Sequence, residues 1–262
     1  ARFELKKIHK CISQLPKIDK YWLALIYFSS KYYHKSFGQT AFTSVPRSIK
    51  DVNTYLPGKK ISKIEKLLNQ VEVTEQKNHD FEDLVLNSDQ KHAVKIILES
   101  RKPVLLHGVT GSGKTRVYAK LIQETLKKIP NSQILLLVPE IGLTPQAFEN
   151  MSTMLNGIEI NLFHSEQTPN LRSKIWLSSL KGKPSLIIGT RISVFLPLPN
   201  LRMIIIDEEH DPSYKQKEGV RYSARNLAIW RGMKKGCKTI LGSATPSIES
   251  CLLYTSPSPR DA

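Results

Sequence analysis

One eight-residue stretch constrains the fold of this chain more than any other: Gly108-Val109-Thr110-Gly111-Ser112-Gly113-Lys114-Thr115. It matches the pattern GxxxxGK[ST] at every position, and an apolar run at 103–107 and a helix-length stretch at 114–128 flank it as the pattern requires. Glycines allow such a loop to wrap around phosphate with its N–H groups pointing inward, and the helix N-terminus adds partial positive charge. We therefore predict that Lys114 reaches the β- and γ-phosphates of ATP and that Thr115 holds Mg²⁺. An ordinary glycine-rich turn between strand and helix is the alternative.

The segment from 87 to 245 alternates between short apolar runs and longer stretches of helical length. The apolar, β-rich runs are residues 103–107, 134–139, 158–163, 186–189, 203–206 and 239–241. The stretches of helical length are residues 114–128, 145–155, 171–180 and 224–234. Two of the runs, 134–138 and 203–206, lack polar alternation, which is typical of parallel strands buried on both faces. The pattern predicts an α/β fold in which helices flank a parallel sheet.

A second motif, Asp207-Glu208-Glu209-His210, follows the buried run 203–206 directly. A carboxylate at the end of a buried strand beside a phosphate loop can hold Mg²⁺ through water, and a second can orient and deprotonate the attacking water. We assign Asp207 to the metal and Glu208 to the base. A solvated acidic turn is the alternative. We expect His210 to relay the state of the nucleotide to neighbouring motifs, and a capping or core histidine is the alternative.

The chain is strongly basic, with 39 Lys and Arg against 23 Asp and Glu and a formal net charge of +16. Such a balance indicates a polyanionic partner, most often nucleic acid. In the segment 213–238 the only acidic residue is Glu218, and three aromatic residues, Tyr214, Tyr222 and Trp230, are interleaved with eight cations. The cations are Lys215, Lys217, Arg221, Arg225, Arg231, Lys234, Lys235 and Lys238. Cations with stacking rings are typical of single-strand binding. A solvated basic face with core aromatics is the alternative.

Several classes of protein are excluded. No run approaches the roughly 18 consecutive apolar residues that a membrane helix needs, so we expect no membrane partner. The three cysteines, Cys11, Cys237 and Cys251, are far apart. They can build neither a disulfide scaffold nor a cysteine zinc site, and they fit a reducing compartment. We therefore expect a cytoplasmic protein.

Composition divides the chain into four parts. Residues 1–60 carry 12 Lys and Arg against 3 Asp and Glu, and residues 61–86 form a predicted helix and an acidic linker. Residues 87–250 form the predicted ATP-binding lobe. Residues 251–262 are expected to be a disordered tail that resembles translated adapter sequence. The first part has helical spacing at 21–33 and, with Tyr32, Tyr33 and Phe37, is expected either to meet DNA or to be a basic-surfaced helical bundle.

Taken in order, the phosphate loop, the Asp207 motif and Gly242-Ser243-Ala244-Thr245 resemble the motifs of superfamily 2 helicases. Finer details make the chain similar to the primosomal replication-restart helicases of that superfamily. They are Asp211, the segment 138–144, Gly189-Thr190-Arg191, and the segments 213–216 and 221–225. The resemblance covers residues 18–250. It implies a RecA-like P-loop NTPase lobe with a small N-terminal basic module that is the end of a DNA-binding region. It also implies a 3′-to-5′ DNA helicase that couples ATP hydrolysis to movement at stalled forks.

The resemblance also implies roles for single residues. Gln90 reads the adenine edge, with a helix-surface residue as the alternative, while Thr190 and Arg191 contact the DNA backbone. Ser243 and Thr245 couple the ATP site to DNA. The segment after Ser213 is an aromatic-rich loop that senses DNA, and it adds Tyr214, Lys215, Arg221, Tyr222 and Arg225 to the DNA and coupling residues. The implied partners are single-stranded and forked DNA, the primosome and single-strand-binding proteins, and the cofactors are ATP and Mg²⁺.

The chain departs from that family in four places. No second motor lobe with its arginine finger follows Ser247, and the residues between 47 and 86 are too few for a winged-helix domain. Zinc is expected in the full-length family, but its cysteine ligands are absent here. Val220 stands where a bulky aromatic residue is expected. Because the first methionine is Met151, we expect a fragment of a longer enzyme that binds ATP weakly and hydrolyses it poorly.

Two other interpretations stay open. The chain could belong to another superfamily 2 DNA translocase, such as a restriction or remodelling motor. It could also be a non-catalytic DNA-binding remnant whose phosphate loop is only structural. Against the remnant, for the full-length protein, stand four intact residues: Lys114, Thr115, Asp207 and Glu208.

Overall fold

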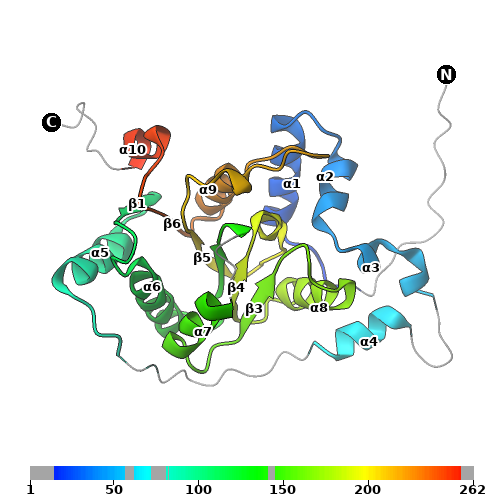
Figure 1. Ribbon diagram of the computed structural model, residues 1–262. Coiled ribbons are helices and arrows are strands. Elements are labelled where there is room, and N and C mark those ends of the chain that lie inside the picture. Colours follow the sequence, from blue (N-terminus) through cyan, green and yellow to red (C-terminus); the bar gives the residue numbers. More distant parts are fainter. Residues whose placement is uncertain (1–14, 57–61, 72–80, 82, 141–144, 255–262) are drawn as a thin grey trace.

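The chain folds around a parallel sheet with helices on both faces (Figure 1). The computed structural model describes residues 15–56, 62–71, 81, 83–140 and 145–254. Within these ranges the sheet has six strands in the order β1-β6-β5-β2-β4-β3, and all of its pairs are parallel. The predicted α/β class and the flanked parallel sheet are thus confirmed.

The elements follow one another in a regular alternation from α5 to β6. The strands are β1 (Val104–His107), β2 (Gln133–Leu137), β3 (Ile160–Phe163), β4 (Ser185–Gly189), β5 (Leu201–Ile206) and β6 (Lys238–Ser243). The helices around them are α5 (Ser88–Glu99), α6 (Lys114–Lys128), α7 (Pro145–Met154), α8 (Pro169–Leu180), α9 (Ala224–Lys235) and α10 (Ile248–Tyr254). Earlier in the chain come α1 (Lys20–Tyr32), α2 (Phe37–Ser44), α3 (Arg47–Lys50) and α4 (Lys63–Asn69). Short 3₁₀ turns are η1 (Val52–Thr54), η3 (Arg191–Phe195) and η4 (Pro212–Tyr214).

Each face of the sheet has its own hydrophobic core. Successive side chains of a strand point to opposite faces, so one run of apolar residues supplies both cores. In β2, Leu135 and Leu137 face the core that includes α1, α8 and α9, while Ile134 and Leu136 face the core that includes α5, α6 and α7. All of these strand residues are buried, which explains the absence of polar alternation.

The carboxyl ends of three adjacent strands position the sequence motifs. In the sheet register His107, the last residue of β1, lies opposite Ser243 of β6, and Ile206 of β5 lies opposite Leu241. The phosphate loop follows β1, the acidic motif follows β5 and the Ser243 motif ends β6. Parallel strands therefore bring three motifs that are far apart in sequence to one edge of the sheet.

The N-terminal helices share a core with the sheet, although a separate module and linker were expected from composition. Trp22 of α1 is buried, and its indole Nε1 donates a 2.7 Å hydrogen bond to the carbonyl of Phe195. Trp176 of α8 is also buried and donates a 3.1 Å bond to the carbonyl of Ser44 at the end of α2. Helix α4 also lies against α8. These contacts make α1, α2 and α4 part of the fold that carries the site.

Two further sequence expectations concern the chain's end and its environment. Helix α10 extends to Tyr254, so the irregular tail expected from residue 251 does not begin there. Residues 255–262 lie outside the described residues. Among the helices of the described ranges, none has both the length and the apolar character needed to cross a membrane.

The shared core generates a prediction about stability. Replacing Trp22 by Ala should lower the free energy of unfolding by about 3 to 5 kcal/mol, because it removes a buried indole and leaves a cavity. Urea denaturation followed by circular dichroism measures this change. Tyr27→Ala on the exposed side of the same helix is the matched control and should change stability by about 0.5 kcal/mol or less. Unchanged stability of Trp22→Ala would mean that α1 unfolds independently of the sheet.

Candidate nucleotide-binding site

The phosphate loop has the backbone that its glycines predict. Gly111 and Gly113 have φ angles of +81° and +82°, in the left-handed region that side chains other than glycine rarely adopt. The loop is anchored where its first residue, Gly108, donates a 3.1 Å bond from its N–H to the carbonyl of Ser243. Gly113 also begins helix α6 as its N-cap and offers no side chain to the helix N–H groups. The positive end of α6 therefore faces the loop.

Lys114 is held at the loop by two oxygen partners. Its Nζ donates to the carbonyl of Gly108 at 2.8 Å and forms an ion pair with Oε1 of Glu208 at 3.4 Å. A cavity of about 420 Å³ lies beside it, lined among others by Gln90, Gly108 and Lys114. The structure thus brings the two predicted motifs into direct contact across the edge of the sheet.

Asp207 is fixed by a tyrosine that the sequence analysis did not single out. The hydroxyl of Tyr118 donates a 2.9 Å hydrogen bond to Oδ1 of Asp207. Burial raises the pKa of Asp207, and the bond from Tyr118 partly offsets that effect. Gly242 makes room for this bond, because a Cβ there would overlap the Tyr118 hydroxyl. Tyr118 lies four residues after Lys114 on the same face of α6, which is the one sequence signal that could have found it.

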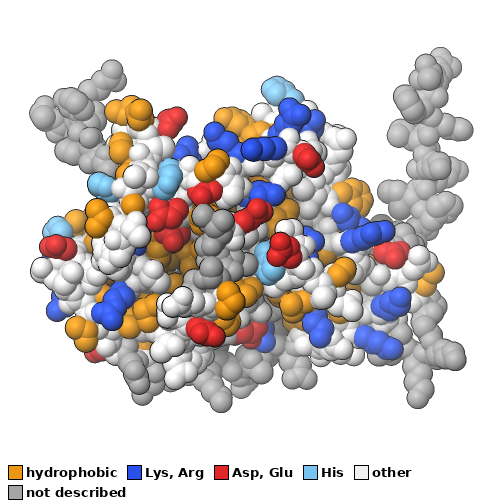
Figure 2. Space-filling view, viewed as in Figure 1, with side chains coloured by type: hydrophobic (Ala, Val, Ile, Leu, Met, Phe, Trp, Pro, Cys, Tyr) orange, Lys and Arg blue, Asp and Glu red, His pale blue; other side chains and the backbone are white. Residues whose placement is uncertain are grey.

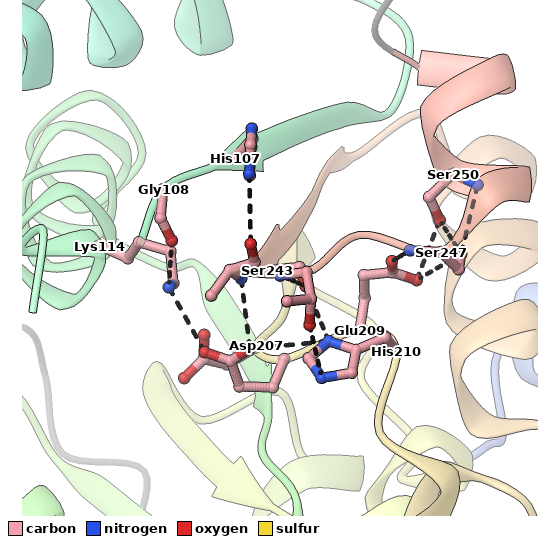
Figure 3. Close-up of polar contacts among 12 residues, drawn as sticks. His107, Gly108, Lys114, Asp207, Glu209, His210, Ser243, Ser247 and Ser250 are labelled. Carbon is pink, nitrogen blue, oxygen red and sulfur yellow. Dashed lines mark hydrogen bonds and ion pairs between the residues drawn. The ribbon is translucent and has the colours of Figure 1, made fainter. Parts of the chain in front are cut away.

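Glu208 and His210 connect the acidic motif to the end of β6. Glu208 has a φ of +43°, an uncommon backbone conformation for a residue with a side chain. His210 lies between two hydroxyls, with Nδ1 at 2.7 Å from Oγ of Ser243 and Nε2 at 3.2 Å from Oγ1 of Thr245, and Figure 3 shows the ring beside Ser243. His210, Ser243 and Thr245, predicted to relay and couple, are thus in contact, and their roles stay predictions.

Glu209, the third residue of the motif, is a second functional candidate that sequence reasoning missed, after Tyr118. Its side chain is buried, with the residue 1% exposed, and points toward Ser247 and Ser250 (Figure 3). It accepts bonds from the N–H of Ser247 at 2.8 Å, from Ser250 Oγ at 2.9 Å and from Arg225 Nη1 at 2.7 Å. Burial would raise the pKa of this carboxyl, but the bonds from Ser247, Ser250 and Arg225 outweigh it and hold the pKa below its usual value. Within a run of acidic residues, nothing local distinguishes it.

Gln90, predicted to read the adenine edge, lies against the phosphate loop. It is the third residue of α5 and closes a capping box with Asn87. Its Oε1 accepts from the N–H of Asn87 at 3.1 Å, and its Nε2 donates to the carbonyl of Ser112 at 3.0 Å. The amide therefore joins α5 to the loop, and contact with adenine stays a prediction.

Two residues predicted to contact the DNA backbone are occupied or buried. Thr190 is 4% exposed, so the structure does not present its hydroxyl on the surface as predicted. The guanidinium of Arg191 bonds to Oε1 of Glu140 at 2.6 Å and to Oε1 of Gln216 at 2.7 Å. Both residues begin the turn after β4, where the half-buried Arg191 joins neighbouring loops.

The predicted stacking role of Tyr214 and Tyr222 is wrong for this structure. They are 2% and 3% exposed, because the apolar rings fill the core beside β5. The hydroxyl of Tyr214 lies 2.5 Å from the carbonyl oxygen of Asp207 and 3.0 Å from that of Leu137. Val220, where a bulky aromatic was expected, is buried as well. Tyr214 thus supports the acidic motif from the core, whereas the ring of Tyr222 packs edge-on against Phe195.

The cations of the same segment differ in their surroundings. Arg225, predicted as a DNA or coupling residue, pairs with Glu209 and bonds to Ser247 Oγ at 2.9 Å. Lys215 and Arg221 are exposed, as DNA contact requires. Trp230 is half-buried, with its ring stacked on Phe28 of α1 at a centroid distance of 4.3 Å.

The residues at the loop fit a nucleotide with Mg²⁺. A Cβ at Gly113 would displace the side-chain amide of Gln90, and the φ of +82° there independently favours glycine. Lys114 supplies a cation, the start of α6 supplies N–H groups, and Asp207 and Glu208 supply carboxylates on the same edge. Bound Mg²⁺ would neutralise charge on the phosphates, with Thr115 and Asp207 as its predicted holders. Among the described residues, no group of three or more His, Cys, Asp or Glu side chains is arranged to hold a metal.

Comparison with known proteins gives a consistent picture. Residues 87–252 match the family model described as DEAD/DEAH box helicase. The chain is 38% identical to Replication restart protein PriA of Rickettsia conorii over 251 residues, covering 94% of this chain and 36% of that protein. The protein of the same name from Haemophilus influenzae is 48% identical over 146 residues, with 56% of this chain and 20% of that protein covered. The resemblance seen in the motifs is thereby confirmed. The chain spans about a third of the length of the Rickettsia relative.

Solved structures are more distant. The Sulfolobus solfataricus SWI2/SNF2 ATPase core in complex with dsDNA is 18% identical, with a TM-score of 0.45 over 67% of this chain and 34% of that chain. The DUF1998 helicase MrfA bound to DNA is 20% identical, with a TM-score of 0.48 over 62% of this chain and 23% of that chain. Likeness at this level says nothing about what this chain binds.

The Tyr118–Asp207 bond generates the second prediction. Tyr118→Phe should raise the pKa of Asp207 further, because it removes a hydrogen bond that favours the carboxylate. The affinity for a fluorescent ATP analogue with Mg²⁺ should fall by about tenfold. In a plot of affinity against pH, the loss of binding on the acid side should move to higher pH. Tyr222→Phe, which removes a buried hydroxyl away from the motif, is the control and should leave both unchanged. An unshifted pH profile in Tyr118→Phe would contradict the assignment.

The buried carboxylate of Glu209 generates the third prediction. Because its pKa is lowered on folding, the charged form stabilises the fold above roughly pH 4, and that contribution is lost as pH falls through the folded value. Glu209→Gln should therefore lower the free energy of unfolding by about 3 kcal/mol at pH 7, and the difference should shrink below pH 4. Urea denaturation across pH measures it. The exposed Glu218→Gln should show no such pattern, and a deficit that is constant with pH would refute the charge argument.

Proposed function

The chain belongs to the DEAD/DEAH box helicase family, and from that premise we propose that it supplies the ATP-binding lobe of a DNA motor. The motor couples ATP hydrolysis to 3′-to-5′ movement along DNA. Helicases of this family use ATP with Mg²⁺, and the phosphate loop, Asp207 and Glu208 are where we expect both to bind.

The observation that carries the proposal is the meeting of two motifs at Lys114. Its Nζ lies 3.4 Å from Glu208 and 2.8 Å from the carbonyl of Gly108, so it bridges the loop and the acidic motif. When phosphate enters, Lys114 is the cation closest to it, and Glu208 is released to orient the attacking water. Asp207, held by Tyr118, is available to the metal through water.

Coupling to DNA is proposed to run through the same edge of the sheet. Glu208 lies 3.7 Å from Nδ1 of His210, and His210 contacts Ser243 and Thr245. A change at the phosphates would therefore reach the end of β6 and the loop that follows it. The exposed Lys215 and Arg221 are the residues of the aromatic-rich segment that we propose for DNA contact.

The biological setting is proposed from the relatives. Their name, Replication restart protein, suggests a role at stalled replication forks, on single-stranded and forked DNA, with the primosome and single-strand-binding proteins as partners. Since the chain spans about a third of the Rickettsia relative, these properties belong to the whole protein. A role on bacterial DNA fits the cytoplasm expected from the sequence.

The fourth prediction tests the motor. In the full-length protein, Lys114→Ala should reduce single-strand-stimulated ATP hydrolysis by about a hundredfold or more, because the phosphates lose their cation. Lys127→Ala, which removes an exposed lysine from the last turn of the same helix, is the matched control and should keep the activity. Hydrolysis that survives Lys114→Ala would refute the phosphate assignment. Hydrolysis in the wild type that single-stranded DNA does not stimulate would refute the motor.

The direction of movement along DNA is tested separately, with a different DNA substrate. Strand displacement on partial duplexes with either a 3′ or a 5′ single-stranded tail distinguishes the two polarities. Unwinding should require the 3′ tail, and unwinding from the 5′ tail would refute the proposed polarity.

A further inference from the structure

A second cavity lies far from the phosphate loop, among the N-terminal helices. It has a volume of about 560 Å³ and is formed by α3, α4 and the beginning of α8. Figure 2 shows Lys and Arg side chains gathered over this part of the molecule, on the opposite side from α5. The volume is within the range of about 300 to 1,000 Å³ that ligand sites occupy.

The lining of this cavity is strongly basic. Four cations line it, Arg47, Lys63, Lys66 and Lys174, against one carboxylate, Asp51. Among the described residues, none of the four cations forms an ion pair. Positive charge without a counter-charge on the protein is stabilised by an external anion.

The carboxylates nearby are used locally. Oδ1 of Asp51 accepts two bonds from Asn53, one from its N–H and one from its side-chain amide, each at 3.0 Å. Glu65 of α4 is turned toward the start of its own helix, where Oε2 accepts from the N–H and the hydroxyl of Ser62. Neither acid forms an ion pair with the lysines on the cavity wall, where the four cations outnumber Asp51.

The pKa of the neighbouring Lys50 is shifted in the direction that positive charge around the cavity predicts. Burial lowers the pKa of Lys50, and repulsion from Arg172 and Arg47 lowers it further. The ammonium of Lys50 donates to the carbonyl of Phe42 at 2.8 Å and so turns from the cavity toward α2. Cations therefore crowd one another on this side of α3.

The remaining lining residues favour an anion with no base to recognise. Pro169 and Asn170 open the 12-residue helix α8, whose N-terminus adds partial positive charge. Lys63 and Lys66 are three residues apart, so they share one face of α4. No aromatic side chain is among the residues that line the cavity within the described ranges, so nothing there stacks on a nucleobase.

From these contacts we infer that the cavity between α3, α4 and α8 binds the phosphate backbone of a nucleic acid, at a site separate from the ATP site. Lysines act as point charges for successive phosphates, and Arg47 offers a planar fork for one of them. The inference rests on the proposed action on DNA and adds a second contact surface to it. Free phosphate or pyrophosphate shares the same chemistry and must be distinguished by experiment.

The fifth prediction tests this site on the 262-residue chain. The triple variant Lys63→Ala, Lys66→Ala, Lys174→Ala should bind a fluorescent single-stranded oligonucleotide about tenfold more weakly or worse, measured by anisotropy. The slope of log affinity against log salt should become shallower by about 2, since each lost phosphate contact contributes about 0.7. The triple Lys-to-Arg variant should restore both quantities, because it keeps the charges.

Matched controls separate this site from general charge and from misfolding. Lys95→Ala, Lys127→Ala, Lys128→Ala removes three exposed lysines from α5 and α6 and should leave the salt slope unchanged. Thermal melting identifies any variant that fails to fold. If the alanine variant fails to fold, the Lys-to-Arg variant decides, because loss of DNA binding in that variant would contradict a role for the charges. Wild-type affinity and slope in the alanine variant would overturn the inference. If the alanine variant kept wild-type DNA binding but pyrophosphate no longer raised its melting temperature, the cavity would be assigned to free phosphates instead. A wild-type chain that binds no DNA would instead refute the proposed function.

Discussion

The pairing of β5 between β2 and β6 is the constraint on which the nucleotide site depends. Every residue from Met203 to Ile206 is fully buried, and successive side chains enter opposite cores. A slip of one residue would exchange the two sets, so the register is fixed. Asp207 must then lie at the carboxyl edge, where its N–H donates to the carbonyl of Leu137 at 2.9 Å. Gly242 of the neighbouring strand leaves the space through which Tyr118 reaches its carboxylate.

The fold and the ATP-binding residues could be predicted because their signals are local. The phosphate loop is a contiguous pattern, and the runs 134–138 and 203–206 show their double burial directly in sequence. The burial of Tyr214, Tyr222 and Thr190 could not be predicted, because it depends on packing between segments far apart in the chain. Aromatic residues among cations look alike whether they stack on a base or fill a core. Only tertiary structure distinguishes the two.

Neighbouring acids in the motif do different work because the backbone turns between them. The left-handed conformation of Glu208 directs that side chain toward Lys114, while Glu209 enters the interior toward Arg225 and Ser247. A non-glycine residue in that region costs about 1 to 3 kcal/mol and persists only where its surroundings hold it. Here the N–H of Glu209 donates to Gly242 and the N–H of Asp211 donates to the carbonyl of Glu208. The acidic motif thus connects the nucleotide side of the sheet with α9 and α10.

The net charge identifies the class of partner, but only cations that are not already bonded to oxygens of the protein can contact that partner. In the segment 213–238, Arg231 is buried and donates to the carbonyls of Val194 and Leu196, both at 2.7 Å. Lys235 donates to the carbonyl of Pro199 and Lys238 to that of Leu98, so backbone oxygens satisfy them as well. The richest basic stretch of the sequence therefore holds the fold together with about half of its cations. Within the part of the chain that the structure describes, the lysines of α4, which belong to a sparser stretch, form no ion pair. A basic residue without a partner on the protein is a stronger pointer to a polyanion than a basic run.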